Sequence, residues 1–431
     1  MPAEAQLLSD ELATIDTLLD DQRFLQPFVE RFACPIGRPT IPMETYLRLM
    51  YLKHRYGLGY ETLVKEVADS LSWHRFCRIR LDASAPHPTT LMKLTRRFGP
   101  AIIEDLNEAL LKAAVKQRVL RSRRLRVDTT VMEADVRYPT DSGLCAHAVS
   151  RLGRAVRRVK AAGLATGTRF RARLKAAGQA VRNISHTFGR PNVRTAIERL
   201  TGELHDLAAA CSGEAERVLR SAKRALDRGA KRGYAAAARL ADEIARAQRV
   251  IGQTARRLRG ETTIPDRVVS LADLDARPIR RGKPQRPTEF GYKLSIGDTP
   301  EGFVVSHHVY QGNPADADTL ETAVVGAKST GMSVRTVFAD RGYGNEVADG
   351  VLDRLGIRDR VVPRRGRAAP VEASAAWRRR YRWRAGAEGR ISHLKRRHGL
   401  ARSRLKGLVG ATIWVGYGVL SHNLDRVVAL S

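Results

Sequence analysis

The stretch Val334-Arg335-Thr336-Val337-Phe338-Ala339-Asp340 decides the fold, because it has the pattern of a buried strand that ends on an aspartate. Valine, threonine and phenylalanine favour strands, and the following Arg341-Gly342-Tyr343 predicts that the chain leaves the sheet directly after Asp340. Open α/β sheets build their sites at the carboxyl ends of strands. The stretch therefore predicts an α/β sheet with a functional carboxylate at its edge, and a simple cap of the next turn is the alternative role for Asp340.

Strand and helix patterns alternate around this strand, and their order predicts an α/β core. The predicted elements are a β-hairpin over 289–309 with its turn at 297–302, a helix near 316–328, a helix over 345–355 and a short strand over 360–362.

A further strand is predicted over Leu125–Met132, whose β-branched residues surround Asp128. An aspartate in a strand is costly if it is buried, so Asp128 is a candidate functional carboxylate. Asp135 and Asp141 follow closely in the sequence and are its rivals. The stretch Tyr138-Pro139-Thr140-Asp141-Ser142 is predicted to be the loop after a second strand.

The formal net charge of +31 points to a polyanionic partner, either nucleic acid or an anionic membrane. Residues 151–260 hold 26 basic and 8 acidic residues, and residues 361–410 hold 15 and 2. The segment 261–360 between them is mildly acidic, with 13 basic and 15 acidic residues. A GC-rich genome explains scattered arginines, but it explains poorly the 11 basic and no acidic residues over 151–190. The distribution therefore favours nucleic-acid binding.

The length of 431 residues predicts two or three structural units. From about 145 to 260, alanine, arginine and leucine dominate, and breaks such as Gly189-Arg190-Pro191 separate long helical runs. This pattern indicates an inserted basic helical unit, which a linker rich in proline and arginine ends at Ala276–Pro287.

The first 110 or so residues are also predicted to be helical. One helix begins at Ile41-Pro42-Met43-Glu44, glycines at 57 and 59 break it, and apolar residues then recur at helical spacing over 60–71. A helix, a glycine turn and a helix fit a DNA-binding helix-turn-helix or the simple packing of a helical bundle, and the sequence leaves both open.

Other features exclude several classes of protein. The longest nearly uncharged apolar stretch, Leu408–Leu420, is shorter than the roughly 20 residues of a membrane span. The N-terminus is acidic where a signal peptide would be basic, so we expect a cytoplasmic protein. The cysteines have no paired metal spacing, which predicts reduced thiols and no zinc site; they are Cys34, Cys77, Cys145 and Cys211.

A third candidate carboxylate, after Asp340 and Asp128, is Glu388, which lies in a very basic helical segment. On a continuous helix, Tyr381, Arg384, Glu388 and Lys395 lie within about 60° of one another around the axis. Such a stripe presents a carboxylate for a metal ion, with an arginine, a lysine and a phenol that can hold phosphate oxygens. A solvated charged helix is the alternative.

Three carboxylates next to a polyanion predict a two-metal site built from Asp128, Asp340 and Glu388. Hard oxygen ligands suit Mg²⁺ or Mn²⁺, and two such ions cleave phosphodiesters without a protein nucleophile. No Ser-His-Asp spacing and no P-loop compete with this interpretation. His307-His308 and His393 are possible ligands, but histidines in such contexts are more often structural.

At this point the sequence resembles the insertion-sequence DDE transposases, specifically the bacterial cut-and-paste group with a Y-x2-R-x3-E-x6-K third motif. That motif is complete here as Tyr381, Arg384, Glu388 and Lys395. The second motif appears as Asp340-Arg341-Gly342-Tyr343 and the first as Val127-Asp128-Thr129-Thr130. Three further stretches resemble the group: Tyr138-Pro139-Thr140-Asp141-Ser142, Phe290-Gly291-Tyr292-Lys293 and Gly312-Asn313-Pro314-Ala315-Asp316.

The resemblance implies an RNase H-like catalytic core, a mixed five-stranded sheet with helices, over 116–144 and 261–431. It also implies a helical N-terminal domain over 1–115 for DNA binding or dimerisation. The inserted basic helical unit, 145–260, departs from the compact pattern because it separates the first two aspartates by a long stretch of chain. It is expected to be a DNA clamp, a dimer contact or both.

For the site, the resemblance implies that three carboxylates bind two Mg²⁺, for which Mn²⁺ can substitute, and that Tyr381, Arg384 and Lys395 contact DNA near the cleaved strand. The three implied metal ligands are Asp128, Asp340 and Glu388. Trp383 is a further DNA-binding candidate, because an aromatic ring beside Arg384 can stack on an extruded base. Packing in the core is the alternative role for this tryptophan.

The implied activity is metal-dependent DNA strand cleavage and strand transfer at the terminal inverted repeats of an insertion sequence. The implied partners are the double-stranded DNA of the repeats and the target, and a second copy of the chain in a synaptic homodimer associated with the nucleoid. Two alternatives stay open, a catalytically inactive or domesticated relative that only binds DNA and a nuclease of the same fold. An RNA-binding role fits the charge but does not predict the three carboxylates.

Overall fold

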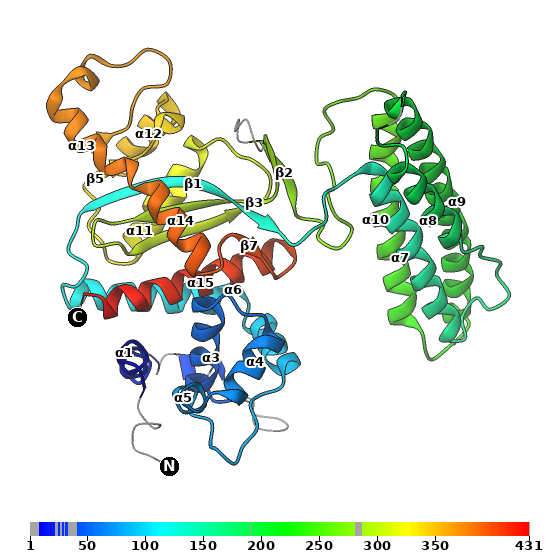
Figure 1. Ribbon diagram of the computed structural model, residues 1–431, viewed down its shortest axis with the longest axis horizontal. Coiled ribbons are helices and arrows are strands. Elements are labelled where there is room, and N and C mark those ends of the chain that lie inside the picture. The colour runs from blue at the N-terminus through cyan, green and yellow to red at the C-terminus, as the bar shows by residue number, and fades with distance from the viewer. Residues whose placement is uncertain are drawn as a thin grey trace. The chain divides into compact units, whose positions relative to one another are not determined.

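The computed structural model describes residues 8–21, 25, 28–29, 31–32, 41–189, 191–280 and 287–430. The chain divides into two compact units, one formed by Met1–Asp135 with Ile279–Ser431 and the other by Val136–Pro278 (Figure 1). We call them the core unit and the helical unit. Cys34 and residues 281–286 of the predicted linker lie outside the described residues.

The core unit is built on a mixed sheet whose strands β2-β3-β1-β5-β6 lie in that order, with β4 on β3 and β7 on β1. Strand β1 pairs antiparallel with β3 and parallel with β5, and β3 pairs antiparallel with β4. The strands are β1 Arg124–Ala134, β2 Arg277–Arg280, β3 Thr288–Asp298, β4 Val304–Tyr310, β5 Thr336–Phe338, β6 Asp359–Val361 and β7 Arg402–Ser403. The antiparallel β1, β3 and β4, with β5 and β6 parallel to β1, form an RNase H-like sheet.

The predicted hairpin and the two helices that follow it are present. The hairpin is β3–β4, and the helices are α11, Leu320–Ser329, which a 3₁₀ turn at Ala317–Thr319 precedes, and α12, Glu346–Arg354. The second strand predicted before Tyr138 is absent, because β1 runs without a break to Ala134 and the next helix begins at Asp141.

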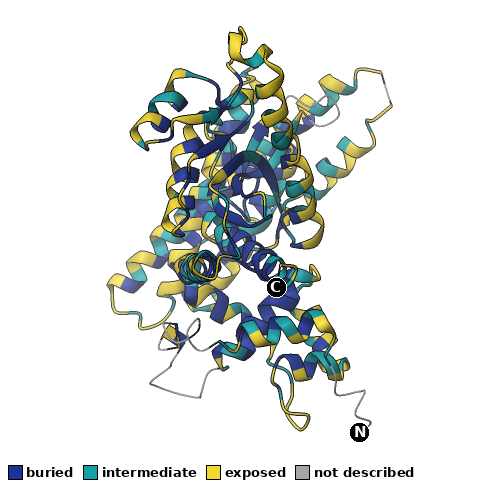
Figure 2. Ribbon diagram, turned by 90° about the vertical axis from the view of Figure 1, so that its left-hand side faces the viewer, coloured by how far each residue is buried: buried dark blue, intermediate teal, exposed yellow. Residues whose placement is uncertain are grey.

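Two long helices pack side by side in the core unit, α6, Pro88–Lys116, and α15, Gly407–Val428 (Figure 1). Glycines let them approach closely, since a Cβ at Gly416 would lie 2.5 Å from Cγ2 of Ile103. Most of α15 is buried, and Figure 2 shows exposed faces on the helices around the buried strands. Thus the most apolar stretch of the sequence is a core helix. Among the described residues, no helix is both long and apolar enough to span a bilayer.

The N-terminal helices belong to the same compact unit as the sheet. They are α1 Asp10–Leu18, α3 Met43–Arg55, α4 Tyr60–Asp69 and α5 Leu71–Phe76. The predicted glycine turn separates α3 from α4, and Gly57 has a φ of 66°, which favours glycine. Nearly all of α3 is buried, and the exposed charged residues of α4 are three acidic ones and one basic one: Glu61, Glu66, Asp69 and Lys65. An acidic exposed face suits bundle packing better than a recognition helix in a DNA groove.

The helical unit contains α7 Asp141–Ala161, α8 Leu174–Ser185, α9 Val193–Asp227 and α10 Tyr234–Leu258, which enclose their own apolar core. Its limits, 136–278, are wider than the predicted 145–260. Thr140 caps α7 by accepting a hydrogen bond from the Gly143 N–H. Two arginines are neutralised inside the unit. Arg151 donates two hydrogen bonds to the carboxylate of Glu243, and Arg173 donates one to Glu214, whose other oxygen accepts the backbone N–H of Arg171.

A buried ion pair joins the two central strands of the sheet. Arg126 on β1 lies opposite Asp298 on β3 and donates from Nε and Nη2 to its two carboxylate oxygens, at 2.8 and 2.6 Å. Its Nη1 donates to the carbonyl of Trp383 at 2.7 Å. Both paired side chains are about 5% exposed or less. The guanidinium therefore ties two strands to the helix that carries Trp383.

We expect Arg126→Ala to lower the free energy of unfolding of the core unit by about 3–5 kcal/mol, because it leaves the Asp298 carboxylate buried without its main partner. All four tryptophans belong to the core unit, so denaturant unfolding followed by tryptophan fluorescence measures this quantity. The control is Arg80→Ala, which breaks an exposed pair with Asp82 and should change stability by less than about 0.5 kcal/mol. Equal effects of the two substitutions would contradict the prediction.

Candidate two-carboxylate active site

Parallel pairing of β1 with β5 brings two predicted carboxylates together. The register places Arg126 opposite Phe338, and two residues farther along, the chain reaches Asp128 and Asp340. The Nη2 atom of Arg384 donates to Oδ2 of Asp128 at 3.1 Å and to Oδ2 of Asp340 at 3.2 Å. The two carboxylates therefore converge on one cationic group.

Backbone amides fix the other oxygen of each carboxylate. Oδ1 of Asp128 accepts the N–H of Thr129, and Oδ1 of Asp340 accepts the N–H of Gly342, both at 2.8 Å. A Cβ on Gly342 would lie 2.9 Å from Oδ1 of Asp340. The glycine of the second motif is thus required for close packing against the aspartate.

Asp128 is the more buried of the two aspartates, with 13% of its side chain exposed. Burial raises the pKa of Asp128 from 3.8 to about 6, Arg384 lowers it, and Asp340 and Asp316 raise it. Neighbouring negative charges and low hydration make an ionised carboxylate costly here. A bound cation would relieve this cost.

A third acidic side chain, Asp316, lies beside the pair, and sequence reasoning assigned it no role. Thr129 donates its hydroxyl to Oδ1 of Asp316 at 2.7 Å, and Nζ of Lys293 lies 2.7 Å from the same oxygen. Lys293 also donates to the carbonyl of Pro314. Lys293 and Asp316 both belong to stretches that resemble the transposase family. The sequence therefore pointed to each residue, but no motif spacing showed that the two side chains meet.

Glu388 lies in the first turn of α14, Ala387–Arg397, and is exposed. No hydrogen bond or ion pair of Glu388 occurs within the described part of the chain. The predicted single helix is wrong, because the chain turns at Gly386 between α14 and α13, Ala375–Ala385. A Cβ on Gly386 would lie 2.7 Å from Nη1 of Arg126. The structure thus joins Asp128, Asp340 and Arg384, and it leaves Glu388 outside their contacts.

The remaining residues of the third motif are partly engaged with the protein. The ring of Tyr381 stacks on Trp377, with centroids 4.9 Å apart. Trp383 meets Phe338 edge to face, and the guanidinium of Arg126 lies 4.7 Å from its ring. A role for Trp383 in base stacking would require it to leave these contacts, so it stays a prediction.

Lys395 donates from Nζ to the carbonyl of Val131 on β1 at 2.7 Å. This contact anchors α14 to the central strand. Of the two rivals of Asp128, Asp141 belongs to the helical unit and accepts a hydrogen bond from Arg267 at 2.7 Å, while Asp135 is exposed just after β1. Neither is among the residues that meet Asp340.

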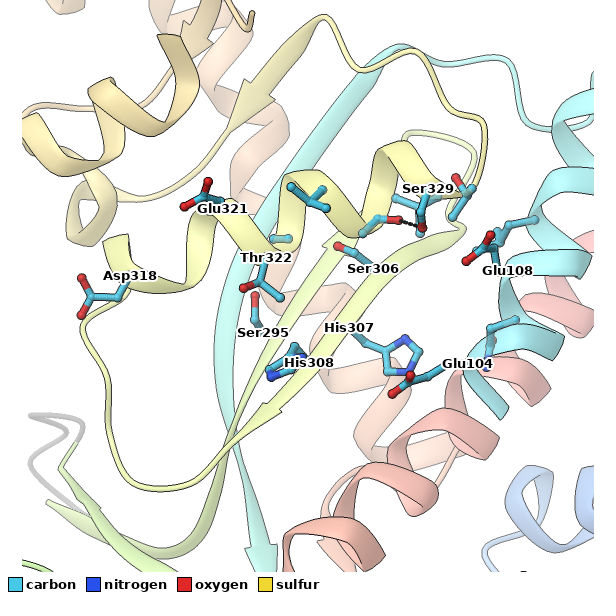
Figure 3. Close-up of a pocket in the computed structure, with 17 residues that line it drawn as sticks. Glu104, Glu108, Ser295, Ser306, His307, His308, Asp318, Glu321, Thr322 and Ser329 are labelled. Atoms are coloured by element: carbon cyan, nitrogen blue, oxygen red, sulfur yellow. Dashed lines mark hydrogen bonds between the residues drawn. The ribbon is translucent and has the colours of Figure 1, made fainter. Parts of the chain in front are cut away.

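His307 and His308 lie on β4, which is two strands away from β1. They line a cavity of about 650 Å³, and Figure 3 shows their rings beside β4, with His307 close to Glu104. Four acidic residues share the lining: Glu104, Glu108, Asp318 and Glu321. An acidic cavity repels phosphate, so it is not part of a DNA site.

The chemistry of the paired aspartates fits a divalent metal ion. Two carboxylate oxygens already face one cationic nitrogen, and oxygen ligands are those that Mg²⁺, Mn²⁺ and Ca²⁺ prefer. An RNase H-like sheet with one aspartate on its central strand and another after the adjacent parallel strand defines a class of nucleic-acid-cleaving catalytic domains.

Comparisons with known proteins identify the family. Residues 3–97 match the model of a transposase domain (DUF772), and residues 269–424 match that of a transposase DDE domain. An uncharacterized protein, ORF8 in the nfe locus of Rhizobium meliloti, is 31% identical over 160 residues, which are 36% of this chain and 76% of that protein. No solved structure matches the chain. The chain belongs to the insertion-sequence DDE transposases, enzymes that act on DNA and generally use divalent metal ions.

We expect Asp128→Asn to stabilise the metal-free protein above pH 6 by about 1–3 kcal/mol, because it removes an ionised group that burial disfavours. The folded pKa of this acid is raised, so the wild type loses stability as the pH rises from about 4 to 6. The gain from the substitution should therefore shrink through that window and vanish below it. Urea unfolding at a series of pH values measures the effect.

The matched control is Asp135→Asn, an exposed aspartate just after the same strand, which should leave stability unchanged at each pH. A destabilising effect of Asp128→Asn at pH 7.5 would show that its ion pair with Arg384 outweighs the cost of burial.

Proposed function

We propose that this transposase catalyses metal-dependent DNA strand cleavage and strand transfer at the terminal inverted repeats of its insertion sequence. The observation that carries the proposal is the convergence of Asp128 and Asp340 on one guanidinium nitrogen at the edge of an RNase H-like sheet. Two carboxylates that share one cationic partner at this edge are also suited to bind the divalent metal ions that assist phosphodiester cleavage.

Two Mg²⁺ ions are the proposed cofactors, and Mn²⁺ can substitute for them. Asp128 and Asp340 would hold them, together with Glu388, whose exposed carboxylate is free to approach a bound ion and DNA. When bound, the ions would activate a water or a 3′-hydroxyl and stabilise the leaving oxygen. Asp316 does not need to be a ligand, because Lys293 already neutralises it.

Arg384 is the proposed phosphate-binding residue nearest the cleaved bond. Its Nε is buried and has no hydrogen-bond partner among the described residues, so it can still donate to a phosphate oxygen. Tyr381, one helical turn earlier on α13, would contact the same strand of DNA. We also propose DNA contacts for Lys395 and Trp383, which would then exchange their protein contacts for DNA.

The proposed substrate is double-stranded DNA of the terminal repeats and the target, bound by a homodimer in a synaptic complex. The protein would act in the cytoplasm on nucleoid DNA. The N-terminal residues 1–115 would serve DNA binding or dimerisation, and the core 116–144 with 261–431 would carry catalysis. The exposed arginines of the helical unit support a role of residues 145–260 as a DNA clamp, a dimer contact or both.

We expect Asp340→Asn and Glu388→Gln each to reduce Mg²⁺-dependent cleavage at the end of the element by at least about 100-fold, because each removes a proposed metal ligand. DNA affinity should change by less than about threefold, since arginines and lysines supply most of it. The assay uses labelled DNA that carries the ends flanking the gene, with Mg²⁺, Mn²⁺ or EDTA.

The matched control is Glu346→Gln, an exposed glutamate in the first turn of α12, as Glu388 is in the first turn of α14. It should cleave like the wild type. Binding of the ends by the wild type without any metal-dependent cut would indicate the DNA-binding relative, and cutting without joining would indicate a nuclease.

We expect the triple substitution Arg154→Gln, Arg157→Gln and Arg158→Gln to weaken DNA binding uniformly across sequences. These exposed arginines of α7 lie in the stretch without acidic residues, 151–190. Loss of three phosphate contacts should reduce the slope of log affinity against log salt by up to about three. Fluorescence anisotropy of labelled DNA over a salt series measures that slope.

The control replaces three exposed basic residues at the end of α9 in the same unit by glutamine: Lys223, Arg224 and Arg228, which caps the helix. An acidic residue, Asp227, lies among them, so the control should change the slope less. Identical slopes for the two triple variants would mean that only the total charge of the helical unit matters.

A further inference from the structure

Three histidines of the core unit gather away from the paired aspartates. They are His393 on α14, His398 just after the end of α14, and His422 on α15. One nitrogen or more of each ring lies within 4.8 Å of the others, and the ring centroids are 5.1–5.4 Å apart. Two helices that are consecutive in the chain therefore meet at an imidazole cluster.

Two of these rings are fully buried and have a nitrogen without a partner. Nδ1 of His398 lies 3.3 Å from the hydroxyl of Ser421, and Nε2 of His422 lies 2.9 Å from the carbonyl of Gly302. The other nitrogens, Nε2 of His398 and Nδ1 of His422, are buried without any hydrogen-bond partner in the described structure. Buried polar atoms without a partner are uncommon in folded proteins, because leaving them unsatisfied is costly.

The bond to Gly302 also fixes the state of His422. A carbonyl only accepts hydrogen bonds, so Nε2 of His422 carries the proton and Nδ1 presents a lone pair. Metal-binding histidines are commonly oriented in this way, by a backbone carbonyl that holds the other ring nitrogen. The unpartnered Nδ1 is therefore a ligand atom that is already oriented.

The rings are neutral at physiological pH, as metal ligands must be. Burial lowers the pKa of His398 to about 2 and that of His422 to about 3. Burial and nearby arginines, Arg390 first among them, also lower the pKa of His393. These three groups therefore keep their lone pairs in the working range of the protein.

A carboxylate next to the cluster offsets the surrounding arginines. Oδ2 of Asp425 lies 3.7 Å from Nε2 of His398 and 3.0 Å from Nε of Arg55. The hydroxyl of Tyr51 donates to the other oxygen of Asp425 at 2.8 Å. Asp425 thus supplies negative charge within reach of a cation at the three rings.

We propose that His393, His398 and His422 bind one transition-metal ion of the zinc class, separate from the cleavage site. Imidazole suits Zn²⁺, Co²⁺ and Ni²⁺. The ligand nitrogens of a tetrahedral site lie about 3.4 Å apart, so the three rings, within 4.8 Å of one another here, would draw closer around an ion. The fourth ligand is water or Asp425.

The ion would have a structural role, because it would fasten α14 to α15. Helix α14 carries Glu388 in its first turn and Lys395 in its last, and α15 is the buried helix of the core unit. A metal at the end of α14 therefore fixes the helix that presents the third predicted carboxylate. The inference does not depend on catalysis, since binding is measurable without DNA.

The test uses the full-length chain with Asp340→Asn, so that metal binding at the carboxylate site is weakened. The chain is stripped with a chelator and titrated with Co²⁺, whose tetrahedral nitrogen complexes absorb visible light far more strongly than octahedral oxygen complexes. Zn²⁺ is then added to displace the Co²⁺. We expect one equivalent to bind, an intense visible band that Zn²⁺ removes, and a higher melting temperature with Zn²⁺.

His393→Ala in the same background removes the least buried ligand, and it should weaken Zn²⁺ binding at least tenfold while leaving the melting temperature of the metal-free chain unchanged. The control is His186→Ala, an exposed histidine at the end of α8. Absence of the visible band in the parent chain, or equal affinity of the parent and His393→Ala, would overturn the proposal.

Discussion

The candidate site of this transposase depends on one buried guanidinium. Arg126 uses Nε and Nη2 for Asp298 on the neighbouring strand and Nη1 for the carbonyl of Trp383. Taking both charges out of water is costly, and only good geometry and full hydrogen bonding offset that cost. Arg390 of α14 adds a second contact to Asp298, at 3.2 Å. The helices on either side of Gly386 are therefore both held to the sheet by the Arg126–Asp298 pair, α13 through Arg126 and α14 through Asp298.

This anchoring sets the position of Arg384, the residue after Trp383. Arg126 also lies two residues before Asp128 on the same strand, so both side chains project from the same face of β1. Parallel pairing with β5 then brings Asp340 beside Asp128. Two constraints thus position the site: the register of β1 with β5, and the hydrogen bond from Arg126 to the Trp383 carbonyl just before the turn between α13 and α14.

The sequence predicted the parts of the site that depend on local pattern. Asp340 was predicted from a strand that ends at a glycine turn and Asp128 from an acidic position within a strand, and the stripe of the third motif added Arg384. Glu388 was predicted from the same stripe, but it lies outside the contacts of these three residues. The prediction that the third-motif residues share one face of a single helix failed at Gly386, because helical periodicity assumes a helix without a break. Only the structure shows that Arg126 leaves little space for a side chain at Gly386. The link between Lys293 and Asp316 was also hidden, since they are far apart along the chain.

Charge balance explains why Arg384 occupies this position. Asp128, Asp340 and Asp316 lie within a small region, and Arg384 and Lys293 neutralise them in part. Under the proposed function, Asp128 and Asp340 would hold a divalent ion, whose charge would neutralise them in place of Arg384. The guanidinium would then be free to bind a phosphate oxygen, beginning with its unpartnered Nε. Arg384 would thus stabilise the carboxylates before the metal arrives and the DNA afterwards, which explains why an arginine, with several donors in one plane, suits this position better than a lysine.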